Sequence, residues 1–261
     1  MSFKNKLFAG ATALALAGSG VALAGAGVAH AATPSCGISC VDIFNDQFGD
    51  AATGHPAFLL DSYKQGVATG TPLILFRESN HDPAEDFVFE NQGTVADFYA
   101  AGLVGASTAL HYGCIPGVNF PDCGFGPFDL EAYEVEYAPF GAPTGQCVGV
   151  AATPTAGEKV TLQPCGVSAK TVWIVDLVDG ALGAEPFGNG VPLINGANTN
   201  FSHPFVMTYP DNGYPTDMPR PVINVTNLSG HFTGVFPNNS TVTADVNSNQ
   251  LWDADLGTVQ I

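Results

Sequence analysis

Six cysteines are the residues of this chain whose type and spacing most clearly specify chemistry. An even number of cysteines in an exported chain favours disulfides over metal binding or redox catalysis. Six cysteines allow many pairings, and the most economical one joins neighbours along the sequence. We therefore predict the pairs Cys36–Cys40, Cys114–Cys123 and Cys147–Cys165.

A second group of reactive side chains lies between His81 and Asp86, where the sequence is His-Asp-Pro-Ala-Glu-Asp. It offers imidazole and carboxylate ligands within one turn, and calcium favours several oxygen ligands on a flexible loop. The segment lacks the regularly alternating ligands and the central glycine of a calcium loop. We therefore predict a solvated acidic turn with no metal and no cofactor.

The sequence contains none of the common catalytic motifs. It has no serine nucleophile elbow, no paired HExxH ligands, no phosphate-binding loop and no Gly-x-Gly-x-x-Gly after a strand. The many carboxylates could supply the acid pair of a glycosidase, although no spacing selects a pair. A secreted glycoside hydrolase is therefore the third of three functional hypotheses, and we assign no catalytic residue.

The first 31 residues have the pattern of a secretory signal peptide. Lys4 and Lys6 precede an uncharged run over residues 7–29, which ends in Ala29-His30-Ala31, a small-x-small cleavage site. An uncleaved anchor is the alternative, because the run is long enough to span a bilayer, but its Ala and Gly content makes it weakly hydrophobic. We predict a signal peptide over 1–31 and a secreted protein with no membrane attachment after cleavage.

Charge and composition limit the partners. After cleavage five basic residues remain against 24 acidic residues, a net charge of −19. Such a surface repels phosphate backbones, so we exclude nucleic acid as a partner. Charged residues make up only 12% of the chain and apolar residues 46%, which favours a packed core over an acidic disordered tail. We expect a monomer.

The elements that would position these residues are short strands. Runs of β-branched and aromatic residues are bounded by Gly, Pro, Asn or Asp, and no long helical periodicity follows residue 31, which predicts an all-β sandwich or barrel. We predict an irregular leader over 32–54, one β domain over 55–261 and a loop over 111–128. The expected strands include 57–62, 72–76, 86–90 and 133–137.

The best-defined segment covers residues 145–175. A strand over 146–150, a turn at Ala156-Gly157 and a strand over 160–165 form a hairpin, which places Cys147 and Cys165 on neighbouring strands. A third strand, Thr171-Val172-Trp173-Ile174-Val175, carries a core tryptophan. The hairpin gives the Cys147–Cys165 pair support that the other two pairs lack.

This segment resembles one repeat of the ricin-B type β-trefoil lectins. Their lobes run Cys-Leu-Asp-Val, then Val-x-Leu-x-x-Cys, then Gln-x-Trp. Asn249-Gln250-Leu251-Trp252 repeats the last block, in a lobe beginning at Val222-Ile223-Asn224-Val225. Leu60-Asp61 and 87–89 form a weaker third match, with Phe89 at the tryptophan position. The region 145–257 also resembles a group of exported actinobacterial proteins of unknown function.

The resemblance implies a β-trefoil-like fold with disulfide staples, in which three lobes surround a pseudo-threefold axis. Long loop insertions, at roughly 106–132 and 180–219, would account for lobes about twice the usual length. A β-sandwich is the alternative.

The resemblance also implies where a sugar would bind. In such lobes an acid in the Cys-Leu-Asp-Val block accepts hydrogen bonds from sugar hydroxyls, and an aromatic ring stacks on the sugar face. The middle lobe has Gly149 at the acid position, with Lys170 and Thr171 in place of Asn and Gln, so it lacks this clamp. The candidate ligand-binding residues are Asp61, Phe76 and Asp86 in the first lobe and Asn224 and Asn249 in the last.

Two functional hypotheses precede the hydrolase. The first is a secreted non-catalytic binding protein, lectin-like with mostly degenerate sugar sites, whose partner is a glycan or a cell-wall component. The second is an extracellular structural or cell-wall interaction protein that keeps the core without binding glycans. The residues Gly149, Lys170 and Thr171 favour the second hypothesis.

Overall fold

The computed structural model describes residues 40–45, 58–77, 82–115, 118, 130–175, 191–210, 222–229 and 246–256. The predicted signal peptide, most of the predicted leader, and Cys36 and Cys123 lie outside these ranges.

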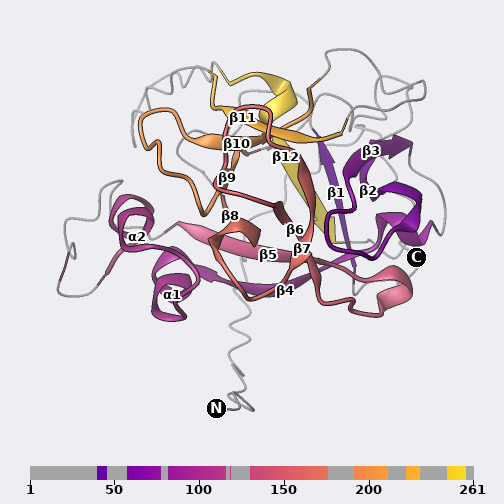
Figure 1. Cartoon of the computed structure of the whole chain (residues 1–261), viewed down its shortest axis with the longest axis horizontal. Coiled ribbons are helices and arrows are strands. Elements are labelled where there is room, and N and C mark those ends of the chain that lie inside the picture. The colour runs from indigo at the N-terminus through magenta and orange to yellow at the C-terminus, as the bar shows by residue number, and fades with distance from the viewer. Residues whose placement is uncertain are drawn as a thin grey trace, which may run out of the picture.

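Twelve strands, in three groups of four, make up the described fold (Figure 1). The first lobe contains β1 (Val41–Asn45), β2 (Phe58–Ser62), β3 (Leu73–Arg77) and β4 (Phe87–Thr94). The second contains β5 (Glu131–Tyr137), β6 (Gln146–Val150), β7 (Val160–Pro164) and β8 (Val172–Val175). The third contains β9 (Leu193–Asn195), β10 (Phe205–Thr208), β11 (Asn224–Asn227) and β12 (Trp252–Leu256).

The first and last strands of each lobe close a six-stranded barrel. The pairs β1–β4, β4–β5, β5–β8 and β8–β9 are antiparallel, β9 reaches β12 through a bridge between Val191 and Trp252, and β12 pairs with β1. A closed ring leaves no strand edge unpaired. The all-β prediction is therefore confirmed, and the β-sandwich alternative is wrong because the sheet returns to its first strand.

The two middle strands of each lobe form hairpins that cover one end of this barrel. The hairpins are β2–β3, β6–β7 and β10–β11. They contact one another cyclically through three bridges, Pro72–Thr161, Lys159–Asn224 and Val222–Ile74. Because the same pairing recurs three times around one axis, the fold is β-trefoil-like, as predicted.

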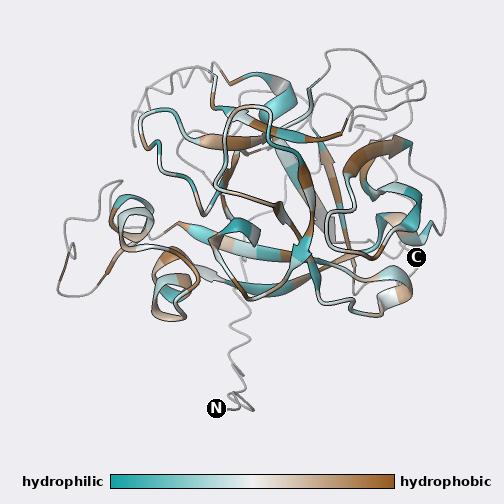
Figure 2. Ribbon diagram, viewed as in Figure 1, coloured by the Kyte–Doolittle hydropathy of each residue, from teal (hydrophilic) through white to brown (hydrophobic). Residues whose placement is uncertain are grey.

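Side chains that alternate along the strands give the barrel two cores. In the ribbon, hydrophobic residues recur along the strands, for example in β1, β3 and β10 (Figure 2). Val135, Trp173 and Trp252 point inward and pack against residues of the hairpins. Ile174 and Ile194, on the opposite faces of their strands, pack outward in a second cluster under the helices. Successive residues of a strand face opposite sides, so the strands β5, β8 and β9 are buried on both faces.

Two short α-helices, which the sequence analysis did not predict, cover this outer cluster. They are α1 (Val95–Ala100) and α2 (Ala106–Tyr112), and they lie on the side of the molecule away from the β2–β3 hairpin (Figure 1). The Thr94 hydroxyl accepts from the Asp97 amide and the Asp97 carboxylate accepts from the Thr94 amide, which caps α1. None of the described helices is long and apolar enough to cross a membrane.

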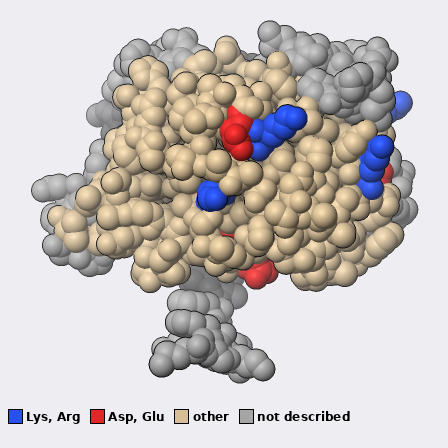
Figure 3. Space-filling model, in the orientation of Figure 1, with Lys and Arg blue, Asp and Glu red and all other residues tan. Residues whose placement is uncertain are grey.

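Within the described ranges, five single turns of 3-10 helix join the strands. They are η3 (Tyr63–Gln65), η4 (Pro83–Glu85), η5 (Pro139–Gly141), η6 (Ala169–Thr171) and η7 (Ser248–Gln250). Charged side chains are few and scattered on the face shown in Figure 3. No basic patch for a polyanion gathers among the described residues of that face.

The predicted leader and the predicted tryptophan register both need correction. Residues Val41–Asn45 form a barrel strand that pairs with β12 over its whole length, so the domain includes part of the 32–54 segment. Trp173 and Trp252 lie opposite Asn195 and Asn45, and the matching position of the first lobe, opposite Tyr137, holds Phe87 instead of Phe89.

The predicted Cys147–Cys165 disulfide is present and joins the start of β6 to the end of β7. Cys40 and Cys114 are also disulfide-bonded; the pairs Cys36–Cys40 and Cys114–Cys123 stay predictions, because Cys36 and Cys123 are outside the described residues. A loop of 18 residues closed by a disulfide contributes about 3 kcal/mol in the chain-entropy account.

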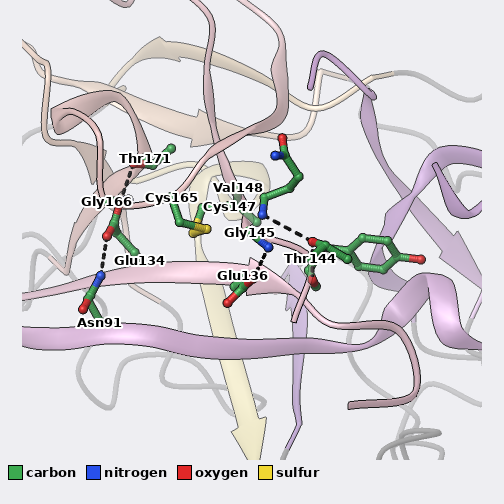
Figure 4. Close-up of a disulfide and its surroundings, with 12 residues drawn as sticks. Asn91, Glu134, Glu136, Thr144, Gly145, Cys147, Val148, Cys165, Gly166 and Thr171 are labelled. Carbon is green, nitrogen blue, oxygen red and sulfur yellow. Dashed lines mark hydrogen bonds between the residues drawn. A yellow bond between two sulfur atoms is a disulfide. The ribbon is translucent and has the colours of Figure 1, made fainter. Parts of the chain in front are cut away.

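Two buried carboxylates on β5 hold the ends of this hairpin beside the disulfide (Figure 4). Glu136 accepts a hydrogen bond from the Gly145 amide. Glu134 accepts from the Gly166 amide at 2.9 Å, from the Thr171 hydroxyl at 2.5 Å and from the Asn91 side chain at 2.6 Å. These bonds tie the β6–β7 hairpin to the barrel.

Glu90, at the bulge of β4, should make stability depend on pH. Partial burial of this surface residue, a hydrogen bond with Glu136 and the negative charges of Glu136 and Glu134 raise its pKa above the ordinary 4.5. Because the folded pKa exceeds the unfolded one, the stabilisation from protonated Glu90 is complete below pH 4.5 and is lost as the pH rises through the folded pKa. We expect Glu90→Gln to raise the Tm at pH 7 relative to wild type, with a smaller difference at pH 4.

The control for Glu90 is Glu158→Gln, which changes net charge equally on a partly exposed residue of another lobe. Thermal unfolding at both pH values measures the effect. A Glu90→Gln Tm difference that is the same at pH 4 and pH 7, or that equals the control's, would contradict the assignment.

Candidate functional site

The threefold pairing identifies three equivalent positions where a sugar-binding acid would stand. Leu59, Cys147 and Val206 are the hairpin residues that pair with the first strand of their own lobe. Two residues further along lie Asp61, Gly149 and Thr208, opposite Ile74, Thr161 and Asn224 respectively. The three lobes can therefore be compared residue by residue.

The second lobe has no room for a side chain at this position. A Cβ added to Gly149 would lie 2.8 Å from the Lys170 carbonyl oxygen and 2.9 Å from the Thr171 side chain. Lys170 itself donates from Nζ to the Ala151 carbonyl at 2.9 Å. The glycine therefore serves close packing between β6 and η6, and an acid cannot replace it without moving backbone.

The third lobe fills the same position with internal hydrogen bonds. The Thr208 hydroxyl is buried and lies 2.8 Å from the Thr226 hydroxyl. Gln250 donates from Nε2 to both hydroxyls, at 3.4 and 2.8 Å respectively. The Thr208 hydroxyl therefore already has hydrogen-bond partners within the protein.

Asn224 and Asn249, both predicted to bind ligand, lie beside Thr208. Asn224 is on the second strand of the hairpin, directly opposite Thr208, and does not open the lobe as the resemblance suggested. Asn249 donates from Nδ2 to the Tyr209 carbonyl at 2.9 Å. Each amide oxygen is buried without a hydrogen-bond partner among the described residues. A ligand-binding role for either residue stays a prediction.

In the first lobe, by contrast, the acid position opens into a pocket. The pocket has a volume of about 270 Å³ and is lined by Asp61, Tyr63, Lys64, Gln65, Ile74, Phe76, Asp82 and Ala84. Asp61 is 4% exposed, whereas Phe76 and Tyr63 are partly exposed. The structure thus brings the predicted residues Asp61 and Phe76 together in one pocket, whose two aromatic rings are those of Phe76 and Tyr63.

The loop after β2 carries backbone strain at this pocket. Lys64 and Gln65 adopt left-handed backbone conformations, with φ of 56° and 55°, which are uncommon for residues other than glycine. Asp82 accepts from the Ala84 amide at 3.0 Å and from the Gln65 side chain at 3.3 Å. Strained residues of this kind cluster at functional sites.

The third predicted residue of the first lobe, Asp86, does not line the pocket. It is fully buried, and its Oδ2 accepts from the Phe140 amide at 2.7 Å. Its carbonyl accepts from the Ala138 amide. Asp86 therefore holds the start of β4 against the chain that follows β5. Tyr63 and Gln65 also line the pocket, and neither was predicted to belong to the site although both follow Asp61 within four residues.

Three carboxylates at this end of the first lobe have the geometry of a cation site. Asp61, Asp82 and Glu85 each offer an oxygen, and these oxygens lie within 4.8 Å of one another. Burial and then the negative charges of Asp61, Asp86 and Asp82 raise the pKa of the Tyr137 hydroxyl. A hard cation such as calcium prefers carboxylate oxygens, so these are the residues that could hold one.

Comparison with known proteins gives fold similarity only. No protein-family model and no curated protein matches the chain. A designed 3-fold symmetric protein, ThreeFoil, is similar at a TM-score of 0.45 and 10% identity, over 83% of this chain and 97% of that one. The Rhizoctonia solani agglutinin is similar at a TM-score of 0.39 and 13% identity, over 83% of this chain and 94% of that one. At these values neither neighbour indicates a ligand for this chain.

Proposed function

We propose that this chain is a secreted, non-catalytic glycan-binding protein whose binding site is the first-lobe pocket around Asp61. One observation carries the proposal. Of the three equivalent positions, Gly149 is closed by backbone and Thr208 is internally hydrogen-bonded, whereas Asp61 lines an open pocket. The two other lobes are the degenerate ones.

The chemistry of the pocket suits a sugar ring. A sugar presents an apolar C–H face and a set of hydroxyls, which need aromatic contacts together with hydrogen-bond acceptors and donors. Phe76 and Tyr63 supply the rings, the Asp61 and Asp82 carboxylates accept, and the Gln65 amide both donates and accepts. The volume of about 270 Å³ is just below the range of about 300–1,000 Å³ that is typical of ligand pockets, which favours one sugar residue over a buried oligosaccharide.

The second candidate is an extracellular structural or cell-wall interaction protein without glycan binding. The packing around Gly149 favours it, because that lobe has kept its disulfide and tryptophan while excluding an acid. The two candidates differ in one measurable property, which is binding of a free glycan in solution.

A glycan array followed by calorimetry tests the proposal. We expect micromolar to millimolar binding by the wild type, and Asp61→Asn should weaken it at least tenfold, because a hydrogen bond to a charged acceptor contributes about 1.5–3 kcal/mol. Titrations with calcium and with EDTA show whether the three carboxylates act through a cation. Glu158→Gln is the control carboxylate and should bind as the wild type does.

Two outcomes would contradict the proposal. The first is an array on which the wild type binds no glycan, which would leave the interaction-protein candidate. The second is binding that Asp61→Asn and Phe76→Ala leave unchanged, which would place any glycan site outside the first lobe.

A further inference from the structure

The barrel itself contains a second, larger cavity, separate from the hairpin pocket. Its volume is about 390 Å³. Every barrel strand contributes to its wall, through Ile43, Phe89, Tyr133, Trp173, Leu193 and Trp252. Leu60, Val148 and Met207, from the first strand of each hairpin, form its floor.

This cavity extends toward the barrel end opposite the hairpins. Val175 is the last residue of β8, Val191 precedes β9, and both line it. The hairpins connect the other ends of these strands, so the two valines lie at the barrel end opposite the hairpins. Phe89, Tyr133 and Leu193 are partly exposed, whereas Trp173 and Trp252 are each 1% exposed. The exposure of the lining residues therefore falls from that end toward the floor.

The wall is apolar, and its main polar groups are already bonded. Trp173 donates from Nε1 to the Val148 carbonyl and Trp252 donates to the Met207 carbonyl, both at 2.9 Å. The Tyr133 hydroxyl donates to Glu131. Gln92 and Asp253 are the remaining polar side chains among the described lining residues, which include no Lys or Arg. Water gains few partners in such a space.

Barrels of this width are normally filled by their own side chains, whereas an apolar pocket reaches among the inward-facing residues of this one. A cavity of about 390 Å³ lies within the range of small-molecule sites. We infer that this cavity binds a small, uncharged apolar molecule, such as one with an alkyl chain or an aromatic ring.

Ligand binding in this cavity can be followed by the fluorescence of the protein's own tryptophans. Its only two tryptophans, Trp173 and Trp252, both line the cavity. The neutral probe N-phenyl-1-naphthylamine should therefore bind saturably, quench the tryptophan emission and receive energy from it. An Asp61→Asn variant should bind the probe as the wild type does, so this test is independent of the proposed glycan site.

A variant that fills the cavity gives the decisive comparison. Ala254 is exposed and lines the cavity on β12, so Ala254→Phe should weaken probe binding at least tenfold without lowering the Tm. The matched control is Ala152→Phe, at an exposed turn outside the cavity, and it should bind as the wild type does. If Ala254→Phe does not fold, Gln92→Phe, at another exposed lining residue, replaces it.

Absence of saturable probe binding by the wild type would overturn the inference. Equal binding by the wild type and the folded cavity-filling variant would also overturn it, because the probe would then bind elsewhere.

Discussion

Trp252→Ala is expected to lower the free energy of unfolding by about 3–5 kcal/mol, as do other buried tryptophan truncations. Trp252 is 1% exposed and belongs to the barrel core. Its indole donates to the Met207 carbonyl at 2.9 Å, and its backbone bonds with Val191 at the closure of the barrel. The truncation removes apolar contacts and leaves a buried carbonyl unbonded. Because small domains are stable by only about 5–15 kcal/mol, the variant should be close to unfolding.

Trp252→Phe is the matched control, because the first lobe already has Phe87 at the equivalent position. It keeps a ring and loses only the N–H donor and part of the volume, so we expect a cost of about 1–2 kcal/mol. Urea unfolding followed by circular dichroism measures both variants. Equal costs for Ala and Phe would contradict the account of the core, as would an Ala cost below about 1 kcal/mol.

Glu134→Gln is expected to cost about 2–4 kcal/mol, although the two side chains have nearly the same shape. Glu134 is fully buried, and its two oxygens accept from donors on different segments, Thr171 and Gly166 on one oxygen and Asn91 on the other. A glutamine amide must turn an N–H₂ group toward one set of donors. Turned toward Thr171 and Gly166, this group leaves both donors without an acceptor. Turned toward the exposed Asn91, whose amide can reorient, it gives Thr171 and Gly166 a neutral acceptor in place of a charged one. Either arrangement costs about 1–2 kcal/mol for each of these two bonds.

The comparison for Glu134→Gln is again Glu158→Gln, which removes one negative charge from a partly exposed residue. Urea unfolding at pH 7 should show a change within about 0.5 kcal/mol for this control. If Glu134→Gln changes the free energy of unfolding by no more than this control does, the Glu134 carboxylate does not hold the β6–β7 hairpin as described.

The parts of the fold with local signals were predictable from the sequence. The 145–175 segment contains a hairpin turn, paired cysteines and a tryptophan strand, and all three are found as predicted. Strand β1 was missed because its pairing with β12 joins residues about two hundred positions apart. The helix α1 was missed because six residues are too few to display a helical period.

The wrong assignment of Phe89 to the tryptophan position shows why strand register is difficult to predict from sequence. Phe87 and Phe89 both face the barrel interior, since alternate residues share a face. Both residues are phenylalanines, so residue type does not show which one stands at the tryptophan position. The pairing of Phe87 with Tyr137 shows that it is Phe87. The predicted and observed positions differ by two residues, so both assignments place the same set of side chains on the inward face of β4.

The candidate site was predictable only in part, for a similar reason. Asp61 and Phe76 lie on adjacent strands of one hairpin and meet at the pocket. Asp86 was chosen by its nearness in sequence to a strand end, but η4 turns it inward to the Phe140 amide. The barrel cavity had no sequence signal at all, because six strands from three lobes build its wall.

Amide chemical-shift mapping tests the central claim, that the first-lobe pocket binds a glycan, most directly. Isotopically labelled protein is titrated with the glycan that gives the strongest array signal. We predict that the shifts concentrate at residues 61–65, 74–76 and 82–84, and that Asp61→Asn removes them. Shifts centred on Gly149 or Thr208, or no shifts with any glycan, would contradict the claim.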